Sequence, residues 1–236
     1  MEPRVPDNIR IYAIGDIHGK LDLLEALQEK IVADANDAGS TQIVQIFLGD
    51  YVDRGPNSKG VVDWLLEPPP IGWRRICLKG NHEAHVLNFF KTPEIIRNWQ
   101  RYGGLENLQS YGVNLISLQG EDAPDILMKD YSKKFPQTHF EFFSNLPLFV
   151  EFGDYFFVHA GVRPGVALNE QKEEDLTWIR DEFLLSEMDF GKVIVHGHTP
   201  RQQPEILANR INIDTRAYDT GRLTCLVLEN GWQRIL

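Results

Sequence analysis

The stretch IRIYAIGDIHGKLDLLEALQEKI, residues 9–31, contains the signal of a strand followed by that of a helix. Residues 9–14 form a short apolar and β-branched run, which is typical of a buried strand. A helical stripe follows, because the next apolar residues recur at the spacing of one helix face: Leu23, Leu24, Leu27 and Ile31. Between them lies a polar segment with a glycine at each end, residues 15–19.

The same alternation continues along the chain. A second apolar run, Ile43–Leu48, precedes another helical stripe, which ends before Pro68–Pro70, and a third run covers Arg75–Leu78. Strands that alternate with helices build a parallel sheet. The N-terminal third of the chain is therefore predicted to fold as β-α-β-α-β.

The middle of the chain has a different pattern. From Ala84 to Pro147 helical and loop signals dominate, which predicts a helical insertion over one end of the sheet. Strand signals then resume at Leu148–Phe152, Tyr155–Val158, Val193–Val195, Arg210–Ile213 and Leu223–Leu228. Hairpin turns are predicted at Gly153–Asp154 and Asn230–Gly231, and a helix over Leu176–Leu185. The predicted fold class is α/β, with mixed β-sheets flanked by helices.

The composition is that of an ordinary globular protein. The 236 residues include 42% apolar and 25% charged residues, so a single domain over residues 1–236 is expected. The formal charge of −10 disfavours nucleic-acid binding. The apolar runs are far shorter than the ~20 residues of a membrane helix, and no membrane contact is expected. Because the N-terminus lacks an apolar targeting core, a cytoplasmic location is the default.

Polar residues beside glycine end five of the predicted strands. They lie in the segments Gly15–Gly19, Gly49–Gly55, Gly80–Glu83, His159–Gly161 and His196–Thr199. In open α/β sheets the loops at the carboxyl ends of the strands form the ligand crevice. These segments are therefore expected to converge on one point.

The donor atoms of these segments suit a pair of metal ions. Oxygen and nitrogen donors without cysteine favour two clustered divalent ions of borderline hardness, such as Mn, Fe, Co or Zn. Asp50 is central in the set and is the candidate to bridge both ions. Such a pair lowers the pKa of a bridging water and holds the attacking and leaving oxygens of an in-line displacement, which is the chemistry of phosphoester hydrolysis.

Five motifs occur in a defined order: GDIHG at residues 15–19, GDYVDRG at 49–55, GNHE at 80–83, VHAG at 158–161 and HGHTP at 196–200. Together they resemble the phosphoprotein phosphatase family within the metallophosphoesterases, and more narrowly the bacterial and phage serine/threonine phosphatases. The resemblance runs from about Ile11 to Leu228. It implies one calcineurin-like domain, a metallophosphoesterase-like sandwich of mixed sheets, and two divalent metal ions, Mn first, with Fe, Zn, Co or Ni as alternatives.

The resemblance also implies the metal ligands. The first metal would be held by Asp16, His18 and Asp50, and the second by Asp50, Asn81, His159 and His198. The wider superfamily often adds a histidine where this chain has Pro200. The first site is therefore expected to have fewer protein ligands and more water.

Two further roles follow from the matched motifs. His82 is expected to protonate the leaving oxygen, and Asp53 to orient its ring and support the imidazolium. Arg54 in GDYVDRG and Arg180 in DLTWIRDEF (residues 175–183) are expected to bind the substrate phosphate. A guanidinium suits this task because it offers phosphate a planar bidentate fork.

Several residues near these motifs have ordinary structural interpretations. Surface or cap positions are expected for His85 and His139, and core positions for Trp99 and Trp178. His196 is expected to pack or to support a ligand rather than to bind metal.

The function that the resemblance implies is metal-dependent hydrolysis of phosphomonoesters by a hydroxide bridging the metals, with phosphoserine and phosphothreonine in a protein or peptide as the expected substrate. Phosphotyrosine and the oligomeric state are left open. One alternative is a diadenosine polyphosphate hydrolase of the same superfamily, although that branch tends to have GNHD and to lack the aspartate of VDRG, where this chain has Glu83 and Asp53. Another is a catalytically silent phosphoprotein-binding scaffold, which need not keep all these residues.

One position departs from the family pattern. Close relatives have Asp-Thr-Gly-Ala where this chain has Asp214-Thr215-Arg216-Ala217. A glycine there can adopt a positive φ that other residues adopt only at some cost. Arg216 is expected either to bend the loop differently or to place a cation beside the metals. Such a cation would favour acidic or multiply phosphorylated substrates.

Overall fold

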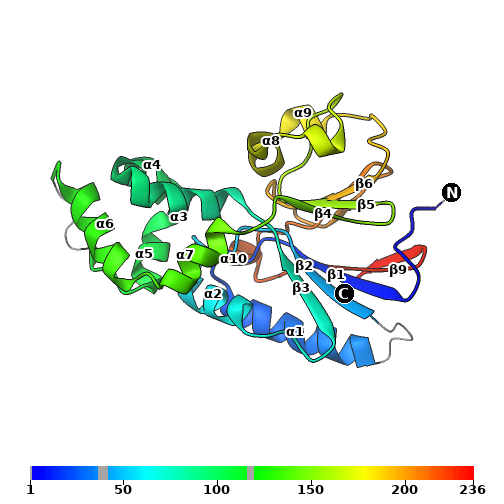
Figure 1. Cartoon of the computed structure of the whole chain (residues 1–236), viewed down its shortest axis with the longest axis horizontal. Coiled ribbons are helices and arrows are strands. Elements are labelled where there is room, and N and C mark those ends of the chain that lie inside the picture. Colours follow the sequence, from blue (N-terminus) through cyan, green and yellow to red (C-terminus); the bar gives the residue numbers. More distant parts are fainter. Residues whose placement is uncertain (1, 37–41, 116–119) are drawn as a thin grey trace.

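The computed structural model describes residues 2–36, 42–115 and 120–236. Within these ranges the chain forms two five-stranded sheets, which stack with helices on their outer sides (Figure 1). The predicted α/β class with mixed sheets flanked by helices is confirmed. None of the described helices has both the length and the apolar character needed to cross a membrane.

The first sheet contains the predicted parallel unit, in the order β10-β9-β1-β2-β3. β1 (Ile9–Ile14), β2 (Gln42–Phe47) and β3 (Trp73–Cys77) run parallel. β9 (Cys225–Glu229) pairs antiparallel with β1, and β10 (Trp232–Ile235) pairs antiparallel with β9. The carboxyl ends of β1, β2 and β3 therefore lie at one edge of the sheet, as the strand-end motifs require.

The second sheet has the order β4-β5-β6-β8-β7. β5 (Tyr155–Val158), β6 (Val193–His196) and β8 (Arg210–Asn212) are parallel. β4 (Phe149–Phe152) joins β5 through the predicted hairpin, and β7 (Glu205–Ile206) pairs antiparallel with β8. The sequence did not predict β7, because two residues are too few to show a strand period.

Alternate residues along each strand face opposite sides of the sheet and contribute to different apolar layers. In β1, Ile11 and Ala13 face the second sheet, whereas Tyr12 and Ile14 face the helices. α1 (Leu21–Asn36) and α2 (Ser58–Leu66) cover this helical side. The layer between the sheets is built from both: Val44, Ile46 and Leu228 from the first, with Phe157, Val195 and Ile211 from the second. The sheets are thereby fixed face to face with their motif-bearing loops together.

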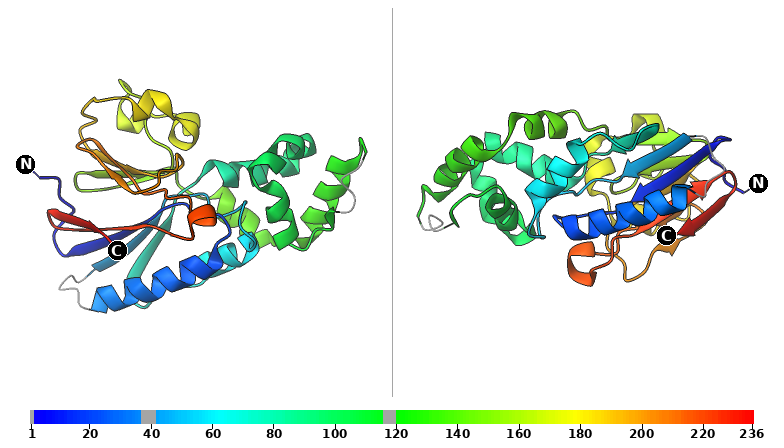
Figure 2. Two further views of the ribbon diagram at one scale, coloured as in Figure 1. Left: turned by 180° about the vertical axis from the view of Figure 1, so that it is seen from behind. Right: turned by 90° about the horizontal axis from the view of Figure 1, so that it is seen from below.

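A helical region lies between β3 and β4 in the chain and stands at one end of the sandwich (Figure 2). Its elements are α3 (Asn81–Lys91), η1 (Pro93–Ile95), α4 (Ile96–Trp99), η2 (Gln100–Tyr102), α5 (Gly104–Ser110), α6 (Ala123–Lys134) and α7 (Gln137–Ser144). Residues 116–119 of the expected insertion lie outside the described residues. α3 begins at the GNHE motif, so this region is connected directly to the strand-end loops.

The prediction of one helix over Leu176–Leu185 is wrong. The structure contains two short helices instead, α8 (Glu173–Trp178) and α9 (Asp181–Leu184), on the outer side of the second sheet. Ile179 (ψ 142°) and Arg180 (φ −131°, ψ −104°) leave the helical conformation between them. No glycine or proline marks this break, so the surrounding tertiary structure overrides the local helical pattern.

Candidate metal centre

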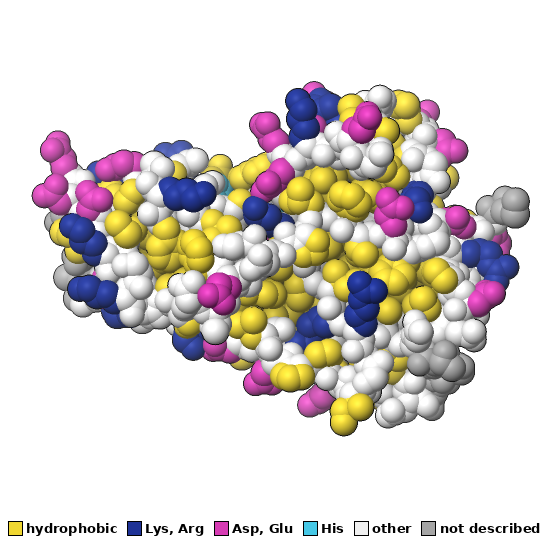
Figure 3. Space-filling view, viewed as in Figure 1, with side chains coloured by type: hydrophobic (Ala, Val, Ile, Leu, Met, Phe, Trp, Pro, Cys, Tyr) yellow, Lys and Arg dark blue, Asp and Glu magenta, His cyan; other side chains and the backbone are white. Residues whose placement is uncertain are grey.

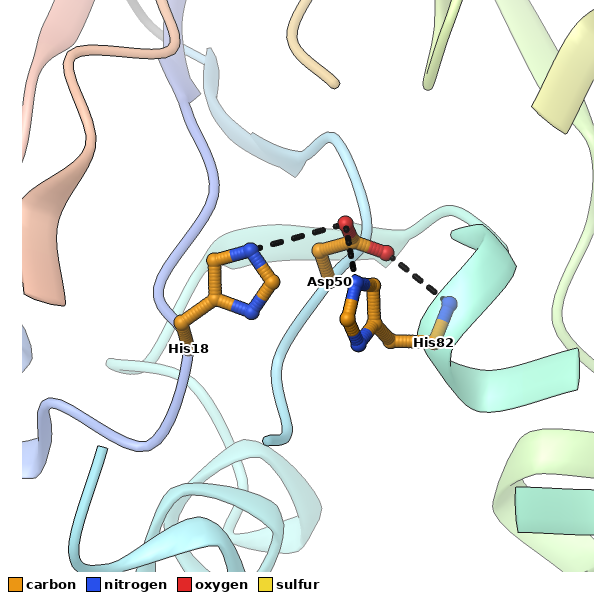
Figure 4. A group of neighbouring side chains, drawn as sticks. All are labelled: His18, Asp50 and His82. Atoms are coloured by element: carbon orange, nitrogen blue, oxygen red, sulfur yellow. Dashed lines mark hydrogen bonds and ion pairs between the residues drawn. The ribbon is translucent and has the colours of Figure 1, made fainter. Parts of the chain in front are cut away.

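The strand-end loops converge on Asp50, which follows β2. Figure 4 shows its carboxylate between the rings of His18 and His82. Asp50 Oδ2 lies 3.6 Å from His18 Nε2 and 3.7 Å from His82 Nε2, and Asp50 Oδ1 lies 3.4 Å from His159 Nε2. All four side chains are buried. Both oxygens of one carboxylate thus face ring nitrogens from different loops, as a bridging ligand must.

The loops that carry these side chains are unusual in their backbone. His18, Asp50, Asp53, Arg54 and His198 all have φ between 47° and 73°, the left-handed region. This region is uncommon for residues other than glycine and costs of order 1–3 kcal/mol each. Such strain concentrates at functional sites, where the surrounding structure holds it in place.

Two motif glycines allow these carboxylates to lie against the backbone. A Cβ atom on Gly80 would collide with the Asp50 carboxylate, and one on Gly197 would collide with the Asp16 carboxylate. The glycines of GNHE and HGHTP are therefore required by close approach to the site.

Backbone carbonyls fix the orientation of two imidazoles. His18 Nδ1 donates to the Val52 carbonyl at 2.9 Å, and His159 Nδ1 donates to the Leu48 carbonyl at 3.0 Å. A carbonyl only accepts, so the proton sits on Nδ1 and Nε2 presents a lone pair toward Asp50. Burial lowers the pKa of His18 to about 3 and also lowers the pKa of His159, so both rings are neutral at pH 7. Neutral imidazole is the form that binds metal.

The second predicted group of ligands also comes together. His159 Nε2 lies 2.9 Å from Asn81 Oδ1 and 3.2 Å from His198 Nδ1. The other ring nitrogen of His198, Nε2, is buried with no hydrogen-bond partner. Asp16 lies beside this group, where its carboxylate accepts from the His198 backbone N–H at 3.1 Å.

Among the residues that the structure describes, two sets of side chains have ligand atoms within 4.8 Å of one another: His18, Asp50 and His82, and Asp50, His159 and His198. Burial, with the charges of Asp214 and Asp50, raises the pKa of Asp16 well above its ordinary value, and burial raises the pKa of Asp214 to about 6. Divalent cations would relieve the repulsion among these buried carboxylates. The donor set therefore fits the metals that the sequence implies.

His82 is held by Asp53, whose two carboxylate oxygens both accept hydrogen bonds. Asp53 Oδ2 accepts from His82 Nδ1 at 2.5 Å and from Trp99 Nε1 at 2.5 Å, and Asp53 Oδ1 accepts from Asn107 Nδ2 at 2.7 Å. Tyr131 Oη in turn donates to Asn107 Oδ1 at 2.9 Å. The helical region thus orients the predicted proton donor, through Trp99 and Asn107, which sequence reasoning did not assign to the site.

The charge environment favours the protonated form of His82. Burial alone would lower its pKa, but the carboxylates of Asp50 and Asp53 outweigh burial and raise the pKa to about 9. Its ring therefore carries a proton at neutral pH, as a general acid requires.

Replacing Trp99 with phenylalanine should weaken catalysis without removing a site residue. The change keeps most of the buried ring but deletes the N–H that bonds the Asp53 carboxylate. A hydrogen bond to a charged group contributes roughly 1.5–3 kcal/mol, so kcat on an alkyl phosphate should fall by ~10–150-fold. Trp73→Phe serves as the control, because Trp73 is the first residue of β3 and the site lies beyond the other end of that strand. Equal kcat values for the two variants would contradict this role of Trp99.

Glu83, the last residue of GNHE, supports the loops. Its buried carboxylate accepts the backbone N–H groups of Asp50 at 3.0 Å, Tyr51 at 2.8 Å and Gly80 at 2.9 Å. Three bonds from two loops fix Asp50 relative to the start of α3. Glu83 thereby positions the loop of Asp50, the predicted bridging ligand, and is itself fully buried.

The two predicted phosphate-binding arginines lie beside different histidines. The central carbon of the Arg54 guanidinium lies 4.7 Å from the centre of the Tyr218 ring. The centres of the Tyr218 and His18 rings are 5.3 Å apart. Arg180 Nη1 donates to Thr199 Oγ1 at 3.1 Å, next to His198 in the chain. The break between α8 and α9 places Arg180 here. Cations thus border the centre both near His18 and near His198.

Trp178 is not a core residue, contrary to expectation. Its side chain is 41% exposed and lies 6.0 Å from the His198 ring and 5.3 Å from His85. Trp178 ends α8, and Figure 3 shows an indentation of the surface between the lobe that carries α8 and the helical region. Trp99, by contrast, is fully buried as expected.

The two histidines outside the motifs, His85 and His139, have other environments than expected, whereas His196 of HGHTP does not. His139 is buried rather than at the surface, with its ring nitrogens bonded to Tyr111 Oη at 2.8 Å and to Asp63 Oδ1 at 3.0 Å. His85 is half-buried against Trp99. His196 packs against Phe183, 5.0 Å between ring centres, in agreement with its structural interpretation.

Arg216 keeps the backbone conformation that glycine favours. Its φ and ψ are both 57°, the left-handed conformation that a residue other than glycine adopts only at some cost. Its guanidinium points toward Asp219 at 3.7 Å and is 46% exposed. The Arg216 backbone N–H bonds Asp214 Oδ1 at 2.8 Å, which ties this loop to the buried carboxylates.

Comparison with known proteins agrees with this geometry. A family model described as calcineurin-like phosphoesterase matches residues 9–225. Serine/threonine-protein phosphatase 2 of Escherichia coli is 28% identical over 227 residues, 91% of this chain and 90% of that protein. The asymmetrical bis(5'-nucleosyl)-tetraphosphatase PrpE of Anoxybacillus flavithermus is also 28% identical, over 235 residues, 90% of this chain and 88% of that protein. A crystal structure of a cold-active protein-tyrosine phosphatase from a Shewanella species superposes with a TM-score of 0.62 at 16% identity, covering 99% of this chain and 83% of that chain, which supports the fold.

Proposed function

The chain belongs to the calcineurin-like phosphoesterase family, and from this premise we propose that it is a phosphomonoester hydrolase acting on phosphoserine and phosphothreonine in proteins or peptides. The observation that carries the proposal is the buried pair of His82 and Asp53, with 2.5 Å between Nδ1 and Oδ2. A protonated imidazole in this position can protonate the oxygen of an alkyl leaving group. The side chains of serine and threonine are such leaving groups, because an alkoxide leaves slowly unless its oxygen is protonated.

Each side chain of the centre has a task in this reaction. Arg54 and Arg180 bind the phosphoryl oxygens and orient the ester. His82 donates its proton to the leaving oxygen, while Asp53 holds the ring and stabilises its charge. The predicted ligands, Asp16, His18, Asp50, Asn81, His159 and His198, would hold two divalent ions, Mn first. When bound, such ions polarise the phosphoryl group and lower the pKa of water.

A dinucleoside tetraphosphate is the second candidate substrate. This candidate is favoured by the similarity to PrpE. The sequence identity to PrpE of Anoxybacillus flavithermus, 28%, is the same as that to the phosphatase of Escherichia coli. The phosphomonoester is preferred because Asp53 and Glu83 make defined contacts here: Asp53 orients His82, and Glu83 holds the Asp50 loop. An anhydride has a phosphate leaving group, which needs less protonation than an alkoxide.

Parallel turnover assays discriminate the two substrates. The wild-type enzyme, loaded with Mn²⁺, would be assayed on phosphoserine, phosphothreonine and phosphotyrosine peptides and on diadenosine tetraphosphate. The proposal expects kcat/KM on the phosphoserine and phosphothreonine peptides to exceed that on the dinucleotide. The reverse order would assign the dinucleotide as substrate, and absence of turnover in both arms and on p-nitrophenyl phosphate would indicate a non-catalytic binding protein.

Removing either phosphate-binding arginine should weaken transition-state binding. Arg54→Ala and Arg180→Ala each delete charge-assisted hydrogen bonds, which contribute roughly 1.5–3 kcal/mol, so kcat/KM should fall by ~10–150-fold. Inorganic phosphate should also inhibit each variant more weakly. Arg74→Ala, on β3, is the control for loss of an arginine. Wild-type inhibition by phosphate in either variant would show that this arginine does not face the substrate.

A further inference from the structure

A groove lies between the loop from β6 to β7 and the segment around α10 (Ala217–Thr220), and it contains Arg216, the residue that departs from the family pattern. Its volume is about 460 Å³. The charged residues that line it are three arginines and one aspartate: Arg201, Arg216, Arg222 and Asp219. The left panel of Figure 2 shows α10 on the near side of the molecule.

The guanidinium groups in this groove are positioned without being neutralised by close ion pairs. Arg222 donates to Gln203 Oε1 at 3.0 Å and to the Gln202 carbonyl at 2.8 Å, both uncharged acceptors. Arg201 Nε is buried without a hydrogen-bond partner, and its contact with Glu205 is 3.9 Å long. Glu205 also pairs with Arg210, at 3.4 Å, so its charge is shared.

Arg216 adds the third cation to the groove. Its contact with Asp219 is 3.7 Å long, and the Asp219 side chain is 62% exposed, where water screens it. Asp219 is the acidic residue among those that line the groove, against three arginines, so positive charge is in excess along the lining. Glu205 and Asp214 lie beyond the lining, and the Asp214 carboxylate accepts the Arg216 backbone N–H. The formal charge of the whole chain is −10, which makes a local excess of cations unusual on this surface.

Both walls of the groove are continuous with the metal centre. The loop that follows β6 contains the predicted ligand His198, and its Arg201 backbone N–H donates to the Asp214 carbonyl at 2.9 Å. The other wall contains Tyr218, whose ring packs on Arg54 and His18. The two segments that form the groove therefore also carry residues of the predicted centre, His198 on one side and Tyr218 on the other.

We propose that this groove binds a second anionic group of the substrate, a carboxylate or a phosphate near the phosphoryl group that is cleaved. The inference rests on the proposed function and names its substrate class as acidic or multiply phosphorylated peptides. Guanidinium groups recognise both anions through paired N–H donors. Arg216, in place of the glycine of the family pattern, completes the cluster.

The test compares matched phosphoserine peptides. One set carries glutamates on the N-terminal or the C-terminal side, a second set carries another phosphoserine, and a third carries glutamine. Wild type should prefer the acidic or doubly phosphorylated peptides to the glutamine peptide at low salt, and high salt should reduce the preference. The two anionic sets distinguish carboxylate from phosphate as the group that binds.

Charge-removing variants connect the preference to the groove. Arg201→Gln and Arg216→Gln should each lower it by roughly 2–5-fold at low salt, the range of an exposed ion pair, and the double variant should remove most of it. Arg97→Gln, an exposed arginine of the helical region, controls for the change in net charge. Thermal unfolding of each variant checks that it is folded.

The outcomes separate this inference from the proposed function. Turnover of p-nitrophenyl phosphate, which is too small to span the groove, reports the centre alone. If peptides are hydrolysed with no preference, or with a preference that the double variant retains, the groove does not bind the substrate. If no peptide is hydrolysed while p-nitrophenyl phosphate or diadenosine tetraphosphate is, the proposed function fails instead.

Discussion

Replacing His82 with asparagine is expected to lower kcat on an alkyl phosphate by ~10²–10⁴-fold, the usual contribution of a general acid. Asparagine cannot donate the proton that the imidazolium, bonded to Asp53, supplies to the leaving oxygen. The kcat on an aryl phosphate such as p-nitrophenyl phosphate should fall much less, because its leaving group needs little protonation. The ratio of the two losses is the measurement.

A control and the metal content complete this test. His85→Asn changes a neighbouring ring, 6.1 Å from His82, and should leave the ratio unchanged. The account expects His82→Asn to bind metal as the wild type does. Because His82 Nε2 also lies 3.7 Å from Asp50, loss of metal in this variant would make His82 a ligand, and equal losses on both substrates would rule out the proton donor.

Replacing Asp50 with asparagine is expected to remove metal and activity together. An amide carries no charge and cannot bridge two cations as a carboxylate does, and even partners outside the ligand shell contribute ~10–100-fold to metal affinity. Metal affinity should therefore fall by more than ~10²-fold, and kcat with it. Elemental analysis and turnover are measured on the same samples, with Asp63→Asn, a carboxylate remote from the centre, as the control.

Folding of the same variant without metal tests the electrostatic argument. Burial alone would raise the pKa of Asp50, but the surrounding histidines outweigh burial and hold this pKa below its ordinary value, so removing the charge should lower the melting temperature of the metal-free protein. The amide oxygen can still accept the His82 backbone N–H that Asp50 Oδ1 accepts at 3.1 Å. An unchanged melting temperature would show that the charge of Asp50 does not stabilise the metal-free fold.

Much of the fold could be predicted from periodicity. The run at residues 9–14 is β1 as predicted, and β2 and β3 overlap their predicted runs, because buried parallel strands are nearly continuous apolar runs. β7, with two residues, and the break at Ile179–Arg180 could not be predicted. Neither has a local signal, because each depends on contacts with distant parts of the chain.

The residues of the candidate site could be predicted where they belong to the sequence motifs, but the residues that support them from outside the motifs could not. The motif histidines and Asp50 come together because the strands that precede them share one edge. Trp99 and Asn107 reach Asp53 across 46 and 54 residues of sequence, and no spacing rule relates them. Arg216 shows the opposite case, since its position was marked by sequence but the direction of its side chain was not.

The metal content of the active wild-type enzyme tests the central claim most directly. Protein loaded with Mn²⁺ and freed of excess would be analysed for metal, and its turnover of a phosphoserine peptide measured before and after chelation and after Mn²⁺ is added back. The account predicts about two ions per chain, loss of activity on chelation and recovery with Mn²⁺. Full activity in protein without bound metal would contradict it.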